Sequence, residues 1–275
     1  MINHITDCTV LNNHIQMPWL GFGVYLVKEG AETEDSVTAA LEAGYRSIDT
    51  AALYKNEADV GRAIARNGFP RQDVFVTTKV WNTDQGYETT LRAFDQSLKK
   101  LKMDYVDLYL IHWPEPGRRK DSWRALEEIR RQGRCRSIGV SNYTIAHLEE
   151  LLRESEVVPV NNQVEFSPFL YQRKLLEYCA AKGITLTAYC PLTHGDKLHH
   201  RVVAEIGRKH GKTGAQVLLR WALQRNVVAI PKSARSQRID ENAALYDFEL
   251  DAQDMNKLDG LDEGYRTSWD PTRVR

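Results

Sequence analysis

The stretch YVDLYLIHW, residues 105–113, is a near-continuous apolar run that closes on a histidine and a tryptophan, His112 and Trp113. A strand of a parallel sheet is covered on both faces and carries such a run, whereas a half-exposed strand alternates apolar and polar residues. The stretch therefore predicts an inner strand of a parallel sheet. The order of the elements on either side of it indicates which parallel fold the chain adopts.

Strand-like and helix-like segments alternate outward from this stretch in both directions. A hairpin is predicted at residues 7–18, with its turn at Asn12–Asn13. The clearest helix has apolar side chains on one face at steps of three and four residues: Tyr87, Leu91, Phe94, Leu98 and Leu101. We expect eight strands in all, at residues 19–25, 45–49, 74–80, 105–113, 135–142, 160–166, 184–190 and 226–233.

Each expected strand is followed by helix. One helix stops at Gly44, a natural C-terminal cap, and another opens at Thr213 with Gln216 three residues on, which is a capping-box pattern. The other helices are expected at residues 57–66, 87–101, around 123–129, 145–152, around 175–179, between 190 and 213, 236–244 and 251–258.

Eight strand–helix units in about 250 residues are typical of a (β/α)₈ TIM barrel. The alternative is a doubly wound open sheet, which usually begins with a G-x-G-x-x-G loop. Residues 21–30, GFGVYLVKEG, lack that spacing, so the barrel is favoured. We find no linker or change of composition, and we expect residues 1–275 to form one domain.

The chain has 275 residues, with 37 basic and 37 acidic side chains. A net charge of zero gives no electrostatic reason to expect nucleic acid or a membrane surface as a partner. The N-terminus is too polar for a signal peptide. Four widely spaced cysteines favour neither a disulfide framework nor a zinc site, so we expect a cytoplasmic protein with no metal.

Polar and ionisable residues stand where several strands end. Asp49, Lys79 and His112 follow three consecutive strands, and Tyr54 lies five residues after Asp49. Taken singly, Asp49 suits a helix cap and His112 a structural role. Strand ends of a barrel converge on one rim, however, and burying such groups together is costly without a use. The pattern therefore predicts a proton-handling site.

Three segments give the chain a family resemblance from end to end. GYRSIDTAALYKNEADVG (residues 44–61), CRSIGVSNY (135–143) and IPKSARSQRIDEN (230–242) resemble the signatures of aldo-keto reductases. KVWNTDQGYETTLRAFDQSLKKL and VDLYLIHWP are most similar to the short bacterial members, which include glyoxal and 2,5-diketogluconate reductases. The resemblance implies a barrel with a short C-terminal loop over the active site, and a monomer.

The resemblance also implies roles for individual residues. Tyr54 would donate a proton to the substrate carbonyl, Lys79 and Asp49 would form an ion pair beside it, and His112 would orient the carbonyl. The substrate would be a small-molecule carbonyl compound walled by Tyr25, Trp81, His112 and Trp113, with Trp269 closing the pocket. NADPH or NADP⁺ would be held by Asp49, Ser141, Asn142, Gln163, Tyr189, Cys190, Pro191, Leu192, Lys232, Ser233, Arg238, Glu241 and Asn242.

Elementary electrostatics bears on the proton donor. A free phenol has a pKa of about 10, and one ammonium at about 4 Å stabilises the phenolate by about 4 kcal/mol at an effective dielectric of about 20. We therefore expect Lys79 to lower the pKa of Tyr54. We expect Asp49 to keep Lys79 charged.

Three residues depart from the family pattern. Ser167 stands where close relatives usually carry His, and Tyr189 and Cys190 stand where they often carry Trp and Ser. A tyrosine can still stack on a nicotinamide, but a thiol is a weaker hydrogen-bonding partner than a hydroxyl.

We expect an NADPH-dependent reductase of aldehydes, ketones or α-dicarbonyls. Lys232, Arg235 and Arg238 form either a phosphate site or a solvated basic face. Two other functions stay open: a cofactor-binding regulatory subunit with negligible turnover, and a hydrolase on a similar barrel. The hydrolase is disfavoured because paired carboxylates and metal-ligand clusters are missing from the strand ends.

Overall fold

The N-terminal residues form the predicted hairpin, which covers one end of the main sheet. In the computed structural model, which describes residues 2–274, β1 (Cys8–Val10) pairs antiparallel with β2 (Gln16–Pro18). The turn between them contains Asn12 and Asn13, whose side-chain amides donate to the backbone carbonyls of Pro159 and Arg136. Both carbonyls lie close to the amino ends of strands, so the hairpin closes that end.

Eight parallel strands form the main sheet, and neighbours in sequence are neighbours in space. The two outermost strands meet through a parallel bridge between Leu20 and Ala229, where the Gly21 amide donates to the Ala229 carbonyl at 2.9 Å. The sheet thereby closes into a barrel. Its strands are β3 (Phe22–Gly23), β4 (Ser47–Asp49), β5 (Phe75–Val80), β6 (Val106–Ile111), β7 (Cys135–Ser141), β8 (Asn161–Glu165), β9 (Thr185–Tyr189) and β10 (Val228–Ala229).

The two closing strands are shorter than predicted. Gly23 donates its amide to the Pro231 carbonyl at 3.0 Å, and a Cβ atom on Gly23 would lie 3.1 Å from the Ile230 carbonyl oxygen. Pro231 has no backbone N–H to continue the ladder. Regular pairing therefore stops after two residues in β3 and in β10, although the chain continues along the expected path.

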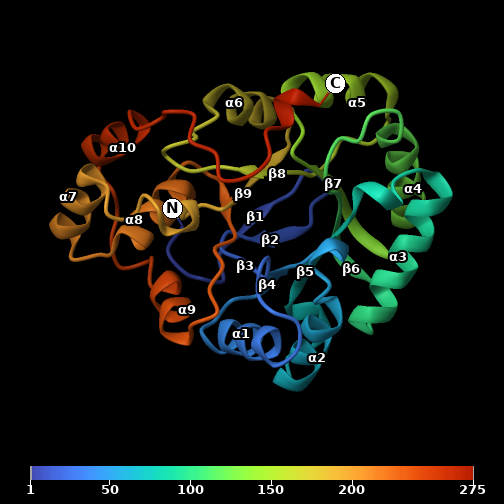
Figure 1. Ribbon diagram of the computed structural model, residues 1–275, viewed down its shortest axis with the longest axis horizontal. Helices are drawn as coiled ribbons and strands as arrows, with labels where there is room; N and C mark the ends of the chain where they lie inside the picture. The colour runs from blue at the N-terminus through green and yellow to red at the C-terminus, as the bar shows by residue number, and fades with distance from the viewer. Residues whose placement is uncertain (1, 275) are drawn as a thin grey trace.

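Helices surround the barrel, as Figure 1 shows. The predicted apolar face of residues 87–101 is buried in α3, with Phe94 packed on Tyr109 at a ring-centroid distance of 4.7 Å. Thr213 and Gln216 form the predicted capping box. The helices are α1 (Ala31–Glu42), α2 (Glu57–Asn67), α3 (Tyr87–Leu101), α4 (Arg119–Arg131), α5 (Ile145–Glu154), α6 (Arg173–Ala181), α7 (Arg201–His210), α8 (Gly214–Gln224), α9 (Ser236–Ala243) and α10 (Ala252–Asp259).

The chain thus has the predicted (β/α)₈ fold with an N-terminal hairpin. After α10 the C-terminal segment crosses the barrel and ends beside α5 (Figure 1). Of the helices in residues 2–274, none has the length and hydropathy needed to cross a bilayer. The carboxyl ends of the strands and this C-terminal segment together form the rim on which the predicted site residues lie.

Candidate active site

The four residues predicted to handle a proton lie together at the carboxyl ends of β4, β5 and β6. Lys79 extends its Nζ atom from β5 to within 2.5 Å of Asp49 Oδ1 and 3.4 Å of the Tyr54 hydroxyl oxygen. The ammonium also donates to the Thr50 carbonyl at 2.9 Å. Tyr54 ends a 3₁₀ helix, Ala52–Tyr54, directly after β4. This short 3₁₀ turn therefore places the Tyr54 hydroxyl beside the Lys79–Asp49 ion pair.

Burial controls the protonation of this group. Lys79 is fully buried, and burial lowers its pKa while the Asp49 carboxylate opposes that change. The pKa of Tyr54 is raised well above its ordinary value, first by burial and then by the Asp49 charge. The expectation that Lys79 lowers this pKa is therefore wrong for the structure. Asp49 lies so close to Lys79 that the pair presents little net positive charge to the phenol.

His112 is held as a neutral imidazole. Burial and the nearby Lys79 charge place its pKa well below the ordinary value. Its ring meets the rings of Tyr54 and Trp81 edge to face, at centroid distances of 5.7 and 5.1 Å. Within residues 2–274 its buried Nδ1 atom has no hydrogen-bond partner. Buried polar atoms are normally hydrogen-bonded, so an unpaired nitrogen at this position needs an explanation.

A polar network joins these residues to β7, β8 and β9. Gln163 donates from Nε2 to Asp49 Oδ2 at 2.7 Å, and Ser141 Oγ donates to the Gln163 carbonyl at 2.8 Å. Asn142, with a left-handed φ of 63°, donates to the His112 carbonyl and accepts from the Tyr189 hydroxyl at 2.8 Å. The predicted amide-binding residues are thus assembled into one preorganised wall.

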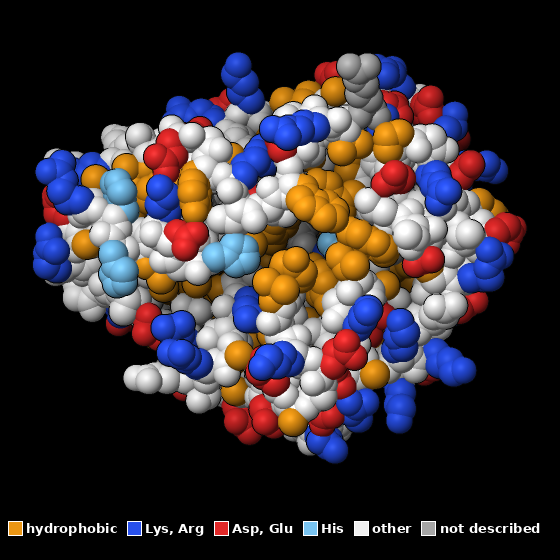
Figure 2. Space-filling view, viewed as in Figure 1, with side chains coloured by type: hydrophobic (Ala, Val, Ile, Leu, Met, Phe, Trp, Pro, Cys, Tyr) orange, Lys and Arg blue, Asp and Glu red, His pale blue; other side chains and the backbone are white. Residues whose placement is uncertain are grey.

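These residues border one large cavity, except the fully buried Lys79 and Thr50, which lie behind its wall. The cavity has a volume of about 1230 Å³. Figure 2 shows apolar side chains gathered around a hollow in this face of the molecule. Aromatic rings form one end of the cavity, which we call the apolar end. There the Trp269 ring centroid lies 5.4 Å from that of Trp113 and 6.1 Å from that of Trp81. The Tyr25 and Tyr54 ring centroids are 4.9 Å apart.

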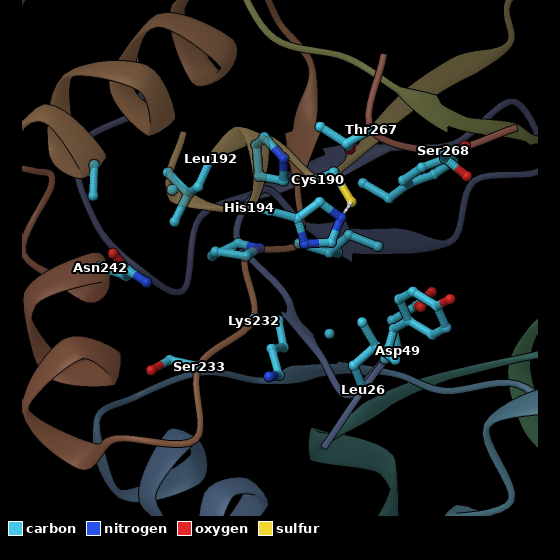
Figure 3. Close-up of a pocket in the computed structure, with 18 of the residues that line it drawn as sticks. Leu26, Asp49, Cys190, Leu192, His194, Lys232, Ser233, Asn242, Thr267 and Ser268 are labelled. Carbon is cyan, nitrogen blue, oxygen red and sulfur yellow. Dashed lines mark hydrogen bonds between the residues drawn. The ribbon is translucent and has the colours of Figure 1, made fainter. Parts of the chain in front are cut away.

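The opposite end of the cavity is cationic. Lys232, Arg235 and Arg238 are exposed there, and within residues 2–274 none of them forms an ion pair. Ser233 is buried beside them, and its Oγ atom accepts from the Arg235 amide at 3.1 Å. Helix α9 begins at Ser236, directly after Arg235, so its amino end also lies here. Figure 3 shows Lys232, Ser233 and Asn242 along this side of the cavity, across from Thr267 and Ser268.

The remaining predicted cofactor residues also lie on the cavity wall. Pro191 and Leu192 border it, as does Glu241, which accepts a hydrogen bond from Thr213. Cys190 has a left-handed φ of 47°, and burial raises the pKa of its thiol to about 11. Its Sγ atom lies 3.4 Å from His194 Nε2 (Figure 3). Ser167 is buried outside the wall, where its hydroxyl accepts from the Phe169 amide.

Sequence reasoning missed other residues at this rim. Leu26 lines the cavity from a loop and Leu53 from the short 3₁₀ helix Ala52–Tyr54. Arg266 lines it from the C-terminal segment, where its Nε atom lies 3.6 Å from Asp270 Oδ1. Loops, a single 3₁₀ turn and an irregular C-terminal segment carry no periodic signal that could have found them. Glu165 was also missed, although it lies two residues after Gln163 and so on the same side of β8. That parity was the available signal.

Comparisons with known proteins agree with this architecture. The family model described as "Aldo/keto reductase family" matches residues 20–263. The glyoxal reductase of Bacillus subtilis (strain 168) is 52% identical over 274 residues, covering 100% of this chain and 99% of that protein. The 9,11-endoperoxide prostaglandin H2 reductase of Trypanosoma cruzi (strain CL Brener) is 47% identical, covering 96% and 95%. The crystal structure of MGS-M4, an aldo-keto reductase from a deep-sea metagenome library, has a TM-score of 0.94 at 42% identity, covering 97% and 99%.

Proposed function

Because the chain belongs to the aldo/keto reductase family and is therefore an oxidoreductase, we propose that it reduces aldehydes, ketones or α-dicarbonyls with NADPH. One observation carries the proposal. A protonated phenol, Tyr54, stands beside the buried Lys79–Asp49 pair and a neutral histidine, on the wall of a large cavity. These groups can protonate a carbonyl oxygen while its carbon is reduced.

The residues of the cavity fit a nicotinamide dinucleotide. The wall of Ser141, Asn142 and Gln163 would face the nicotinamide amide, and Tyr189 would stack on the ring. The unpaired cations at the other end would face the phosphate of the adenosine half. The bound cofactor supplies the hydride. This chain's own residues supply orientation and the proton.

Tyr54 would act as the proton donor. Its raised pKa keeps the hydroxyl protonated at neutral pH, so a proton is available for the carbonyl oxygen. As negative charge reaches the phenolic oxygen, the hydrogen bond that Lys79 Nζ donates to it over 3.4 Å would strengthen, and Asp49 would keep that ammonium charged. The substrate carbon would gain the hydride and its oxygen would gain the Tyr54 proton, giving the alcohol.

His112 would orient the substrate. A neutral imidazole donates one ring N–H, and its low pKa keeps it in that form at working pH. Such a donor can hold the carbonyl oxygen against Tyr54 without competing for the proton. Its ring is fixed by Trp81 and Tyr54, so the donor direction is fixed too.

The cationic end supports a preference for NADPH over NADH. Hydrogen bonds to charged groups contribute about 1.5–3 kcal/mol each. Two such bonds that NADH cannot make correspond to roughly two to four decades in affinity, at about 1.4 kcal/mol per decade. Lys232 and Arg238 would make these bonds, aided by Ser233 and the amino end of α9.

The apolar end supports uncharged substrates. Tyr25, Trp81, Trp113 and Trp269 wall it, and Leu26 and Leu53 extend its apolar rim. The charge of Arg266 is countered by Asp270. Small α-dicarbonyls and aromatic aldehydes suit such walls better than anionic sugars do.

Steady-state NADPH oxidation tests the proposal. We expect turnover with methylglyoxal and with nitrobenzaldehyde, followed by NADPH absorbance and by detection of the alcohol. A cofactor-binding subunit without turnover would bind NADPH and oxidise none of it. Absence of oxidation across a panel of aldehydes, ketones and dicarbonyls would overturn the proposal.

A further inference from the structure

Glu165 is a buried carboxylate that belongs neither to the proton-handling group nor to the cavity wall. It ends β8, and only 3% of its surface is exposed. Within residues 2–274 it forms no ion pair. Its Oε1 atom accepts from the Thr267 amide at 2.5 Å and from the Thr267 hydroxyl at 2.6 Å, and its Oε2 atom accepts from the Ser268 amide at 3.2 Å.

All three donors come from two adjacent residues of the C-terminal segment, 102 and 103 positions along the chain. A buried charge is costly unless hydrogen bonds replace its water, and bonds to a charged acceptor are stronger than neutral ones. Both oxygens of Glu165 therefore bind one short piece of backbone. The arrangement holds residues 267–268 at a fixed place above β8.

The next residue is Trp269, whose position depends on that backbone. Trp269 is 64% exposed, so burial alone does not fix it, yet its ring reaches both Trp113 and Trp81. Further along, the Val274 carbonyl lies 3.0 Å from His147 Nε2 on α5. Trp269 thus lies on a segment, residues 267–274, that we call the strap. The strap is attached at its start to the buried Glu165 and at its end to His147.

The same carboxylate lies beside the cofactor side of the site. Glu165 is the direct neighbour of Tyr189 in the pairing of β8 with β9. Thr267 and Ser268 face the cavity next to Cys190 (Figure 3). One buried group therefore places the strap relative to both the substrate wall and the tyrosine that would stack on the cofactor.

We propose that Glu165 is a positioning residue that latches residues 267–268 and so sets the Trp269 wall of the substrate pocket. This inference rests on the proposed reductase function. Glu165 touches neither substrate nor cofactor and acts through Trp269. Loosening the latch should weaken substrate binding while leaving the proton-handling group in place.

Kinetics of Glu165→Gln, Glu165→Ala and Thr267→Val test the proposal. Glu165→Gln keeps one acceptor oxygen for Thr267 but turns an NH₂ group toward the Ser268 amide, which is itself a donor. Thr267→Val removes only the hydrogen bond from the Thr267 hydroxyl. We expect KM for the carbonyl compound to rise about ten-fold in Glu165→Ala and less in the other two, with kcat within about three-fold and the NADPH Kd unchanged. Glu177→Gln, which alters an exposed acid on α6, is the matched control.

A double-mutant cycle and proteolysis separate positioning from general damage. Trp269→Ala should raise KM about as much as Glu165→Ala, and the double variant should add little to either. Trypsin cleavage after Arg266 can be measured as the loss of intact chain in mass spectra. The cleavage rate should be about ten-fold higher in Glu165→Ala than in wild type, and it should be unchanged in Glu177→Gln.

Several outcomes would overturn the latch. Additive effects of Glu165→Ala and Trp269→Ala, unchanged cleavage, or faster cleavage with unchanged KM would each exclude it. Parallel loss of kcat, NADPH affinity and stability would make Glu165 merely structural. If wild type oxidises no NADPH, the proposed function fails, and the cleavage rate alone decides whether Glu165 holds the strap.

Discussion

The two ends of the cavity use charge in opposite ways. At one end Lys79, Asp49 and His112 are buried, and the amine and carboxylate are 2.5 Å apart. At the other end Lys232, Arg235 and Arg238 are exposed, and within residues 2–274 they have no ion-pair partner. Burial makes the first end sensitive to every charge and suits it to moving a proton. Exposure leaves the second end able to capture an anion at little desolvation cost.

The largest expected effect comes from removing one oxygen at the buried end. Tyr54→Phe should lower kcat by about two to four decades, because general acid catalysis contributes that much. The NADPH Kd should stay within about two-fold, since cofactor binding does not use the phenolic proton. Stopped-flow turnover and fluorescence quenching measure the two quantities.

Tyr178→Phe is the matched control, because it removes a hydroxyl from the surface of α6, away from the cavity. Its kcat should equal that of wild type. If Tyr54→Phe kept most of the wild-type kcat, the buried end would not be the proton donor, and the contrast between the two ends would lose its chemical meaning.

The second effect tests whether burial makes charge pairing obligatory. Lys79→Met leaves the Asp49 carboxylate buried without its ammonium, so we expect a loss of about 3–5 kcal/mol in the free energy of unfolding. Adding Asp49→Asn to Lys79→Met should recover part of that loss. Urea unfolding of the two variants checks this order.

An exposed lysine gives the comparison for that experiment. Lys232→Met should change the free energy of unfolding by less than about 0.5 kcal/mol, as is usual for surface positions. Equal losses in the two lysine variants would show that the two ends do not differ in how they hold charge.

The sequence predicted which residues meet at the buried end, but not how their surroundings change their chemistry. Asp49, Lys79 and His112 follow apolar strands, so their convergence follows from the barrel itself. The direction of the Tyr54 pKa was missed because the sequence names the charged partners without giving their burial or the closeness of Asp49 to Lys79. The short closing strands were missed because they depend on backbone contacts between Gly23 and residues 230–231.

Glu165 marks the limit of such reasoning. Its parity with Gln163 could place it at the rim, but its three donors lie in a segment without apolar periodicity about a hundred residues away. Local patterns do not encode where such a segment returns to the barrel. The family resemblance predicted the functional roles of the site residues, and the strand pattern predicted that these residues lie at the carboxyl ends of the strands.

The third effect concerns the exposed end. Arg238→Ala should weaken NADPH binding by about one to two decades, because one charge-assisted hydrogen bond is lost, and should leave NADH nearly unchanged. The loss should shrink as salt is raised, since the exposed charge is screened. Fluorescence quenching with both cofactors measures it.

NADH serves as the internal control in that experiment, and Arg201→Ala on α7 serves as the matched variant. Equal wild-type affinities for NADH and NADPH would make Lys232, Arg235 and Arg238 a solvated surface. The exposed end would then be no phosphate site at all.

The smallest effect is a pH slope that only the buried end should have. The pKa of His112 is held well below its ordinary value, so the folded protein does not bind a proton there as the pH falls below about 6.5, whereas the unfolded chain does. The contribution of His112 to stability is therefore fully present above that pH. It is lost by about 1.4 kcal/mol for each pH unit below it, until the folded pKa is reached.

Urea unfolding of wild type and His112→Gln at pH 7.5, 6.5 and 5.5, values chosen to span the ordinary histidine pKa of about 6.5, measures this slope. The difference in unfolding free energy between the two proteins should narrow by about 1 kcal/mol from pH 6.5 to 5.5, because the variant lacks the penalty. His199→Gln, at an exposed histidine of the cavity rim, is the matched control. A constant gap between wild type and His112→Gln would mean that the imidazole takes up its proton in the folded state. It could not then act as the neutral donor that holds the carbonyl against Tyr54.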